Sequence, residues 1–94
     1  MSAAPVHHIL FYEYVEDMLE RRGPYREAHL ARIRAQREAG RITLAGALGD
    51  PKPHGAAIVF AGVTRGEIEA FAAADPYVTA GLVKSQRIER WNVV

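Results

Sequence analysis

One histidine lies on the expected buried side of the longest helical pattern in the chain. At 100° per residue, His29 shares an arc with Leu30 and Ile33, which we expect to be core anchors, and Arg26 flanks them one turn earlier. A neutral imidazole can take or give a proton near pH 7, so His29 is a candidate general acid or base. The alternative is a core histidine whose ring nitrogens make ordinary hydrogen bonds.

A carboxylate and a guanidinium are the next candidates. Asp75 directly precedes Pro76, and an aspartate before a proline at the first helical position is a common N-cap. Capping alone would account for Asp75, although a capping carboxylate has a second oxygen for another partner. Arg26 carries a planar fork that suits a substrate carboxylate, but a solvated charge on the helix is an equally good interpretation.

Other kinds of chemistry have weaker support in the sequence. The absence of cysteine excludes a thiol nucleophile, a disulfide framework and a zinc–thiolate site. His7 and His8 would point to opposite faces of a strand and His54 lies in a loop, so we expect no metal site and no cofactor. Ser85 and Thr79 lack the context of an activated nucleophile, which favours general acid–base chemistry over covalent catalysis.

Size and composition indicate one small soluble domain spanning residues 1–94. About half of the residues are hydrophobic (49%), the net charge is +1 and the two signs are interspersed, so nothing favours nucleic acid or an anionic membrane. The apolar run Ala56–Ala61 carries no charge that would help to bind RNA. Without a signal peptide or a membrane span, we expect a cytoplasmic protein.

The elements that must position His29 and Asp75 follow in a recognisable order. The predicted strands are Val6–Val15, Arg41–Leu48, Ala56–Ala61 and Leu82–Val94. One predicted helix is Pro24–Ala39, which Gly40 ends; a second begins with a capping box of Thr64 and Glu67 and carries Ile68, Phe71 and Ala72 toward the core. Single turns are predicted in Glu16–Arg22 and Pro76–Ala80. In the second strand, Ile42, Leu44, Gly46 and Leu48 should share one face, and Gly46 should permit a bulge or the close approach of another group.

This order predicts an α+β fold, the ferredoxin-like βαββαβ arrangement, with an antiparallel sheet and both helices on one face. The first and third strands carry apolar residues on both faces, and this topology places them in the centre. Phe11, Tyr12, Val59 and Phe60 cannot all point at the helices. Because a monomer rarely exposes so much apolar surface, we expect a homodimer that packs through its sheet faces.

Three stretches, taken in order, resemble the YciI-like (YCII-related) family, which consists of small dimeric α+β barrel proteins. They are Arg26–Ile33, Gly40–Ile42 with Ala45-Gly46, and Ala74–Leu82, and the closing Trp91 extends the resemblance over most of the chain. Where the family commonly shows Ala-Gly-Pro, this chain has Ala45-Gly46-Ala47.

The resemblance implies an active site built on a His–Asp pair, which maps onto His29 and Asp75, with Asp75 orienting the imidazole. Arg26, Gly46 and Tyr77 would then bind the substrate. It also implies kinship with muconolactone isomerase-like proteins, including dehydrochlorinases. We therefore expect a small enzyme that isomerises, or eliminates a group from, a small carboxylate-bearing molecule. The alternative is a non-catalytic dimeric domain that binds a small molecule or serves as an accessory subunit.

Overall fold

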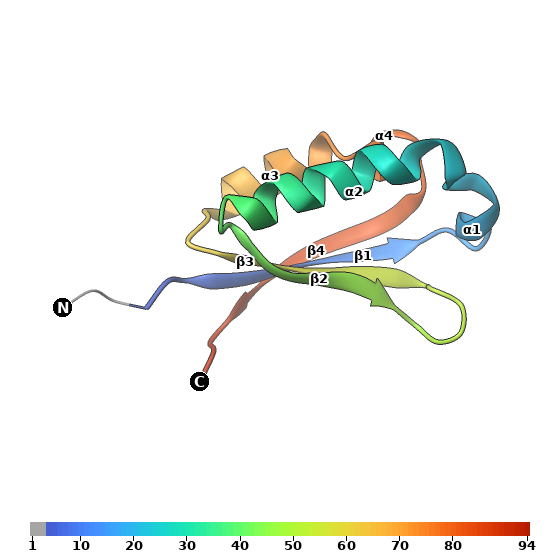
Figure 1. The fold of residues 1–94 in the computed structure, drawn as a ribbon. Helices are drawn as coiled ribbons and strands as arrows, with labels where there is room; N and C mark the ends of the chain where they lie inside the picture. Colours follow the sequence, from blue (N-terminus) through green and yellow to red (C-terminus); the bar gives the residue numbers. More distant parts are fainter. Residues whose placement is uncertain (1–3) are drawn as a thin grey trace.

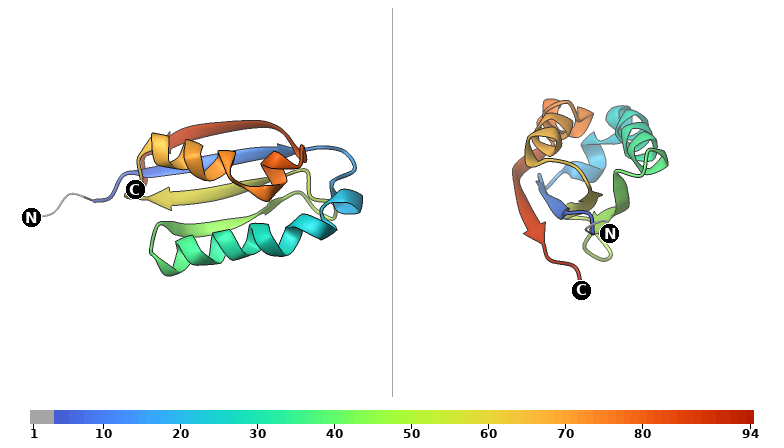
Figure 2. Two further views of the ribbon diagram at one scale, coloured as in Figure 1. Left: turned by 90° about the horizontal axis from the view of Figure 1, so that it is seen from above. Right: turned by 90° about the vertical axis from the view of Figure 1, so that its left-hand side faces the viewer.

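Four strands form one antiparallel sheet, and the helices cover a single face of it (Figure 1). The computed structural model describes residues 4–94, and this range contains the elements β1 (His7–Tyr14), α1 (Met18–Arg21), α2 (Gly23–Glu38), β2 (Ile42–Leu48), β3 (Gly55–Ala61), α3 (Arg65–Ala73), α4 (Pro76–Thr79) and β4 (Val83–Trp91). The strand order is β2-β3-β1-β4, with every neighbouring pair antiparallel. Figure 2 shows α2 and α3 side by side above the sheet.

The predicted ferredoxin-like βαββαβ fold is confirmed, with β1 and β3 in the centre of the sheet. The single helical turns predicted in Glu16–Arg22 and Pro76–Ala80 are present as α1 and α4. As expected, Gly40 ends α2 in the left-handed region with a φ of 77°, where a residue without a Cβ is favoured. The capping box is confirmed in part, because the Thr64 hydroxyl accepts a hydrogen bond from the Glu67 backbone N–H at 3.1 Å.

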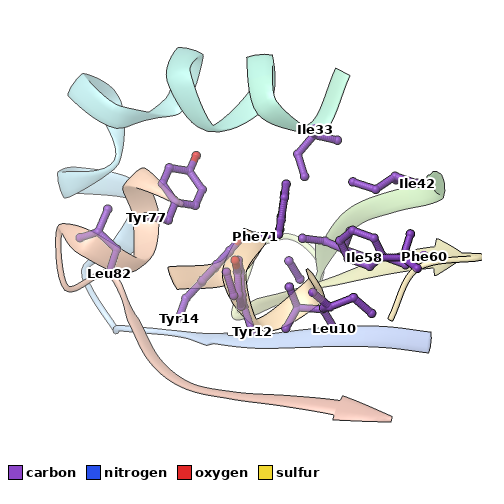
Figure 3. Close-up of a cluster of buried hydrophobic side chains, with 14 of the residues drawn as sticks. Leu10, Tyr12, Tyr14, Ile33, Ile42, Ile58, Phe60, Phe71, Tyr77 and Leu82 are labelled. Atoms are coloured by element: carbon purple, nitrogen blue, oxygen red, sulfur yellow. The ribbon is translucent and has the colours of Figure 1, made fainter. Parts of the chain in front are cut away.

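The core lies between the sheet and the helices. Alternate residues of β1, Leu10, Tyr12 and Tyr14, point to this side, where Ile58 and Phe60 of β3 meet them (Figure 3). The predicted core residues of α3, Ile68, Phe71 and Ala72, are all buried. Arg32 ties the two long helices together, since its guanidinium lies 4.3 Å from the centre of the Phe71 ring and donates to the Phe71 carbonyl at 2.9 Å.

The buried face of α2 is narrower than the helical pattern predicted. Ile33 is a core anchor as expected and His29 is buried beside it, but Leu30 is only half-buried. Arg26 is exposed at the same end of the helix. A helix that lies along the edge of a two-helix layer presents only a thin strip to the sheet, which leaves the flanking positions partly open.

The predicted alternation along β2 is wrong at its first step. Ile42 pairs with Phe60 and Leu44 pairs with Val59, so Thr43 is an extra residue that forms a β-bulge. Ile42 therefore faces the core while Leu44 points to the opposite face of the sheet, where its side chain is 65% exposed. The bulge predicted at Gly46 lies at Thr43 instead, and a Cβ added to Gly46 would meet nothing within 4 Å.

Gly55, in the central strand β3, should be intolerant of any side chain. A Cβ at this position would overlap the carbonyl oxygen of Tyr12 on the neighbouring strand, and a backbone atom of a central strand has little freedom to move. We expect Gly55→Ala to lower the free energy of unfolding by about 2–3 kcal/mol, which corresponds to a melting temperature lower by roughly 10–20 °C.

The control is Gly66→Ala in α3, where a Cβ meets nothing within 4 Å. This change should raise the free energy of unfolding by up to about 1 kcal/mol, because alanine favours a helix over glycine. Thermal unfolding followed by circular dichroism measures both variants. Equal melting temperatures for the two would contradict the clash at Gly55.

Candidate active site

His29 and Asp75 are in direct contact in the interior. Their residues lie 46 positions apart, on α2 and at the start of α4, yet His29 Nδ1 is 2.9 Å from Asp75 Oδ1 and 3.0 Å from Oδ2. The Asp75 side chain has no solvent exposure and His29 is 7% exposed. A buried carboxylate must be satisfied by hydrogen bonds, so the position of Asp75 is set by its partners.

Asp75 is also the N-cap of α4. Its backbone is extended, with φ −69° and ψ 127°, and Oδ1 accepts a hydrogen bond from the Tyr77 backbone N–H at 3.0 Å. Pro76 follows at the first helical position, where its missing N–H costs nothing. The capping interpretation and the His29 partnership therefore hold together, because the two roles share one carboxylate.

Tyr12 is a third partner of Asp75 that sequence reasoning missed. Its hydroxyl donates to Asp75 Oδ2 at 2.9 Å, from the central strand β1. The signal available in the sequence was weak: a tyrosine on the buried face of a strand needs a polar partner for its hydroxyl, but nothing in the sequence says which one. Strand β1, helix α2 and helix α4 thus meet at one buried carboxylate.

Aromatic rings hold the imidazole in place. The Tyr77 ring is stacked on His29, with centroids 3.9 Å apart and an interplanar angle of 10°. Tyr14 meets Tyr77 edge to face at 6.1 Å and 88°. With one ring nitrogen bound by Asp75 and one face covered by Tyr77, the orientation of His29 is restrained before any ligand arrives.

The charges of the site follow from these contacts. Burial by itself raises the pKa of the Asp75 carboxyl, but the hydrogen bond and charge of His29, the Tyr77 N–H and the Tyr12 hydroxyl outweigh it and hold this pKa below its ordinary value. Burial, together with the adjacent Asp75 charge, raises the pKa of Tyr12. Asp75 is therefore an acceptor, Nδ1 of His29 carries a proton, and Nε2 is the nitrogen left for chemistry.

Asp75 should make the stability of the protein sensitive to acid. Its pKa is lower in the folded than in the unfolded chain, so the unfolded chain binds more protons as the pH falls. The stabilisation by the carboxylate is fully present above about pH 4 and is lost as the pH falls through the folded-state pKa. The difference in unfolding free energy between wild type and Asp75→Asn should therefore shrink from pH 7 to pH 3.

Urea unfolding at a series of pH values measures this difference. Asp17→Asn is the control, because the Asp17 side chain is exposed and makes no capping hydrogen bond. A difference between wild type and Asp75→Asn that stays constant down to pH 3 would contradict the predicted linkage.

A cavity of about 220 Å³ opens beside the pair, and all the predicted site residues except the fully buried Asp75 border it. Arg26, His29, Gly46 and Tyr77 contribute to its wall. Tyr14 and Arg22, which the sequence did not single out, lie there too. Since a Cβ on Gly46 would meet nothing, this glycine adds backbone to the wall and makes no close contact. The roles of these residues in binding or catalysis stay predictions.

The remaining histidines lie outside this cavity. Within residues 4–94, no three histidine, aspartate or glutamate side chains gather closely enough to hold a metal ion. His8 points into the protein, where its Nδ1 is buried without a hydrogen-bond partner among the described residues. None of the helices in this part of the chain is long and apolar enough to cross a membrane.

Comparison with known proteins points to one family. The sequence model of the YCII-related domain matches residues 6–92. Among solved structures, the fold is similar to 5-chloro-2-hydroxyhydroquinone dehydrochlorinase (TftG) from Burkholderia phenoliruptrix AC1100, solved in complex with 2,5-dihydroxybenzoquinone. The TM-score is 0.80 at 21% sequence identity, over 94% of this chain and 95% of that one. No curated protein matches the sequence.

Proposed function

This chain belongs to the YCII-related domain family, and we propose that it is a small acid–base enzyme in which His29 moves a proton on a small molecule bound in the cavity. One observation carries the proposal: the buried Asp75 carboxylate lies 2.9 Å from Nδ1 of His29, and the His29 side chain also borders the cavity. Nε2 has no hydrogen-bond partner among residues 4–94 and is not sealed from solvent. It is the atom available to a substrate.

Asp75 acts on the reaction through His29. By accepting from Nδ1–H, it selects the tautomer in which Nε2 has a free lone pair, and it faces the positive charge that forms when Nε2 takes a proton. This is the role of the acid in a catalytic triad, here without a serine. The hydrogen bonds from Tyr12 and Tyr77 to Asp75 keep the carboxylate in position.

The proposed reaction is removal of a proton next to a carbonyl group, followed by isomerisation or by elimination of a leaving group such as chloride. The similar dehydrochlorinase supports the second possibility by its activity and its fold. Arg26 would hold a carboxylate or another anionic group of the substrate, since this residue borders the same cavity and its planar guanidinium suits such a group. Tyr77 and the backbone at Gly46 would shape the walls around it.

The test does not require the natural substrate in advance. Small ketones, keto acids and chlorinated hydroxyquinols are incubated with the protein in D₂O; proton NMR follows exchange of carbon-bound hydrogen, and an ion-selective electrode follows release of chloride. Exchange or chloride release that disappears in His29→Gln supports the proposal. A compound that binds in the cavity equally well to wild type and His29→Gln, with no turnover, would support the non-catalytic binding domain instead.

We also propose that the protein acts as a homodimer that packs through the open sheet face and so forms a dimeric α+β barrel. Leu44 (65% exposed) and Trp91 (43% exposed) lie on this face. Phe11 of β1 lies on the same face, with the Arg87 guanidinium 4.1 Å from its ring centre. Such a surface is apolar enough to be buried by a second copy.

Sedimentation velocity measures the oligomeric state, with Leu44→Lys as the disrupting variant. Leu19→Lys is the control, because Leu19 is also exposed (41%) but lies on α1, away from the sheet face. We expect a dimer for wild type and the control, and a monomer for Leu44→Lys. A monomeric wild-type protein would exclude the proposed interface.

A further inference from the structure

Tyr14 borders the cavity together with Tyr77, and it has no role in the reaction proposed above. Tyr14 ends β1 and is 7% exposed. The hydroxyl of Tyr12, its neighbour on the same face, already donates a hydrogen bond to Asp75 at 2.9 Å. The Tyr14 hydroxyl has no hydrogen-bond partner within residues 4–94 and is not sealed from solvent. A hydroxyl in such a position is available to a ligand.

Tyr14, His29 and Tyr77 all border the cavity. The Tyr77 ring is stacked on the imidazole at 3.9 Å and meets the Tyr14 ring at 6.1 Å, nearly at a right angle. Tyr14 and His29 both border this space of about 220 Å³. This is smaller than the roughly 300–1,000 Å³ typical of sites for drug-sized ligands, and it suits a molecule with one ring.

The Tyr14 hydroxyl is a donor at neutral pH. Burial, and to a smaller extent the nearby Tyr77 and Asp75, raise the pKa of Tyr14 to about 12. The positive charges of Arg22 and Arg26 lower this pKa, but by less. A phenol that keeps its proton can donate a hydrogen bond to a carbonyl oxygen, and that bond strengthens as negative charge develops on the oxygen.

We propose that Tyr14 is a further catalytic residue, which donates a hydrogen bond to the substrate carbonyl oxygen, and that the substrate is accordingly an enolisable carbonyl compound about one ring in size. This inference rests on the proposed function of His29. It adds the group that stabilises the intermediate, and it names the functional group that the substrate must carry.

The electrons and atoms balance with these two residues. Nε2 of His29 takes the proton from the carbon next to the carbonyl, and the C–H electron pair becomes a C=C bond. The C=O π pair moves to the oxygen, and the Tyr14 hydroxyl donates a hydrogen bond to the resulting oxyanion. In isomerisation, the imidazolium returns the proton to another carbon. In elimination, the oxygen pair re-forms the carbonyl, the enolate C=C pair becomes a new double bond between the α and β carbons, and chloride leaves the β carbon with its bonding pair. His29 then releases the proton to water.

The first test compares Tyr14→Phe with Tyr25→Phe in the D₂O exchange assay. Tyr25 is 39% exposed on α2 and does not border the cavity, so its variant should keep the wild-type rate. Tyr14→Phe should lower kcat about 100-fold, as loss of one oxyanion donor does, and should change KM much less. Because the hydroxyl has no protein partner, the melting temperature should stay close to that of wild type.

The second test is binding of 2,5-dihydroxybenzoquinone, a one-ring oxyanion, measured by isothermal titration calorimetry. Its Kd should rise about tenfold in Tyr14→Phe, which is the effect of one hydrogen bond to a charged oxygen, and should not change in Tyr25→Phe. A wild type that exchanges through His29, with kcat and Kd unchanged in Tyr14→Phe, overturns the role of Tyr14 and leaves that of His29. A wild type that neither exchanges nor binds overturns both.

Discussion

Asp75→Ala is expected to lower the free energy of unfolding by about 3–5 kcal/mol, which is the largest effect that we expect from any single substitution in this site. The carboxylate has no solvent exposure and accepts from three donors: the Tyr12 hydroxyl, His29 Nδ1 and the Tyr77 N–H. Alanine would leave the first two donors buried without a partner, at a cost of about 1–3 kcal/mol each. Loss of the cap of α4 adds about 1 kcal/mol.

Such a loss is a large fraction of the roughly 5–15 kcal/mol that stabilises an ordinary domain. Urea unfolding at pH 7 measures it, with Asp17→Ala as the matched control. Asp17 also occupies an N-cap position, but its side chain makes no capping hydrogen bond and its ion pair with Arg21 is exposed at 3.5 Å. The control should change the free energy of unfolding by less than about 0.5 kcal/mol. Similar losses in both variants would mean that Asp75 is not the centre of a buried network.

His29→Gln is expected to reduce exchange of substrate hydrogen at least about 1,000-fold, within the range that general acid–base catalysis contributes. Glutamine has no group that takes a proton near neutral pH, so the catalytic step is lost. Its side-chain amide can still donate to Asp75, and for this reason the fold should survive. The free energy of unfolding should fall by only about 1–2 kcal/mol, clearly less than in Asp75→Ala.

The rate is measured by proton NMR in D₂O on whichever compound of the panel the wild type exchanges. His54→Gln is the control, because His54 is exposed in the loop between β2 and β3 and does not border the cavity, so its variant should keep the wild-type rate. If His29→Gln retains more than about a tenth of the activity, the proton is transferred by another group and the proposed mechanism is wrong.

Much of the fold could be predicted from local patterns. The helix stop at Gly40, the Thr64 cap and the Asp75-Pro76 helix start depend on neighbouring residues only, and the structure agrees with each of them. The apolar runs of β1 and β3 indicated the two central strands, and the strand order β2-β3-β1-β4 agrees. The bulge at Thr43 escaped prediction, since an extra residue is visible only against the partner strand.

The sequence by itself determined the elements, their order and the presence of an imidazole on the inner side of α2. The family resemblance pointed to Asp75 as its partner. Only the tertiary structure decided which groups meet: Tyr12 reaches Asp75 across 63 residues of chain, and Tyr14 borders the same cavity as His29. The reason is physical. Local patterns follow from backbone geometry, whereas a hydrogen bond depends on atoms within about 3 Å of each other, and for distant segments that proximity is set by packing alone.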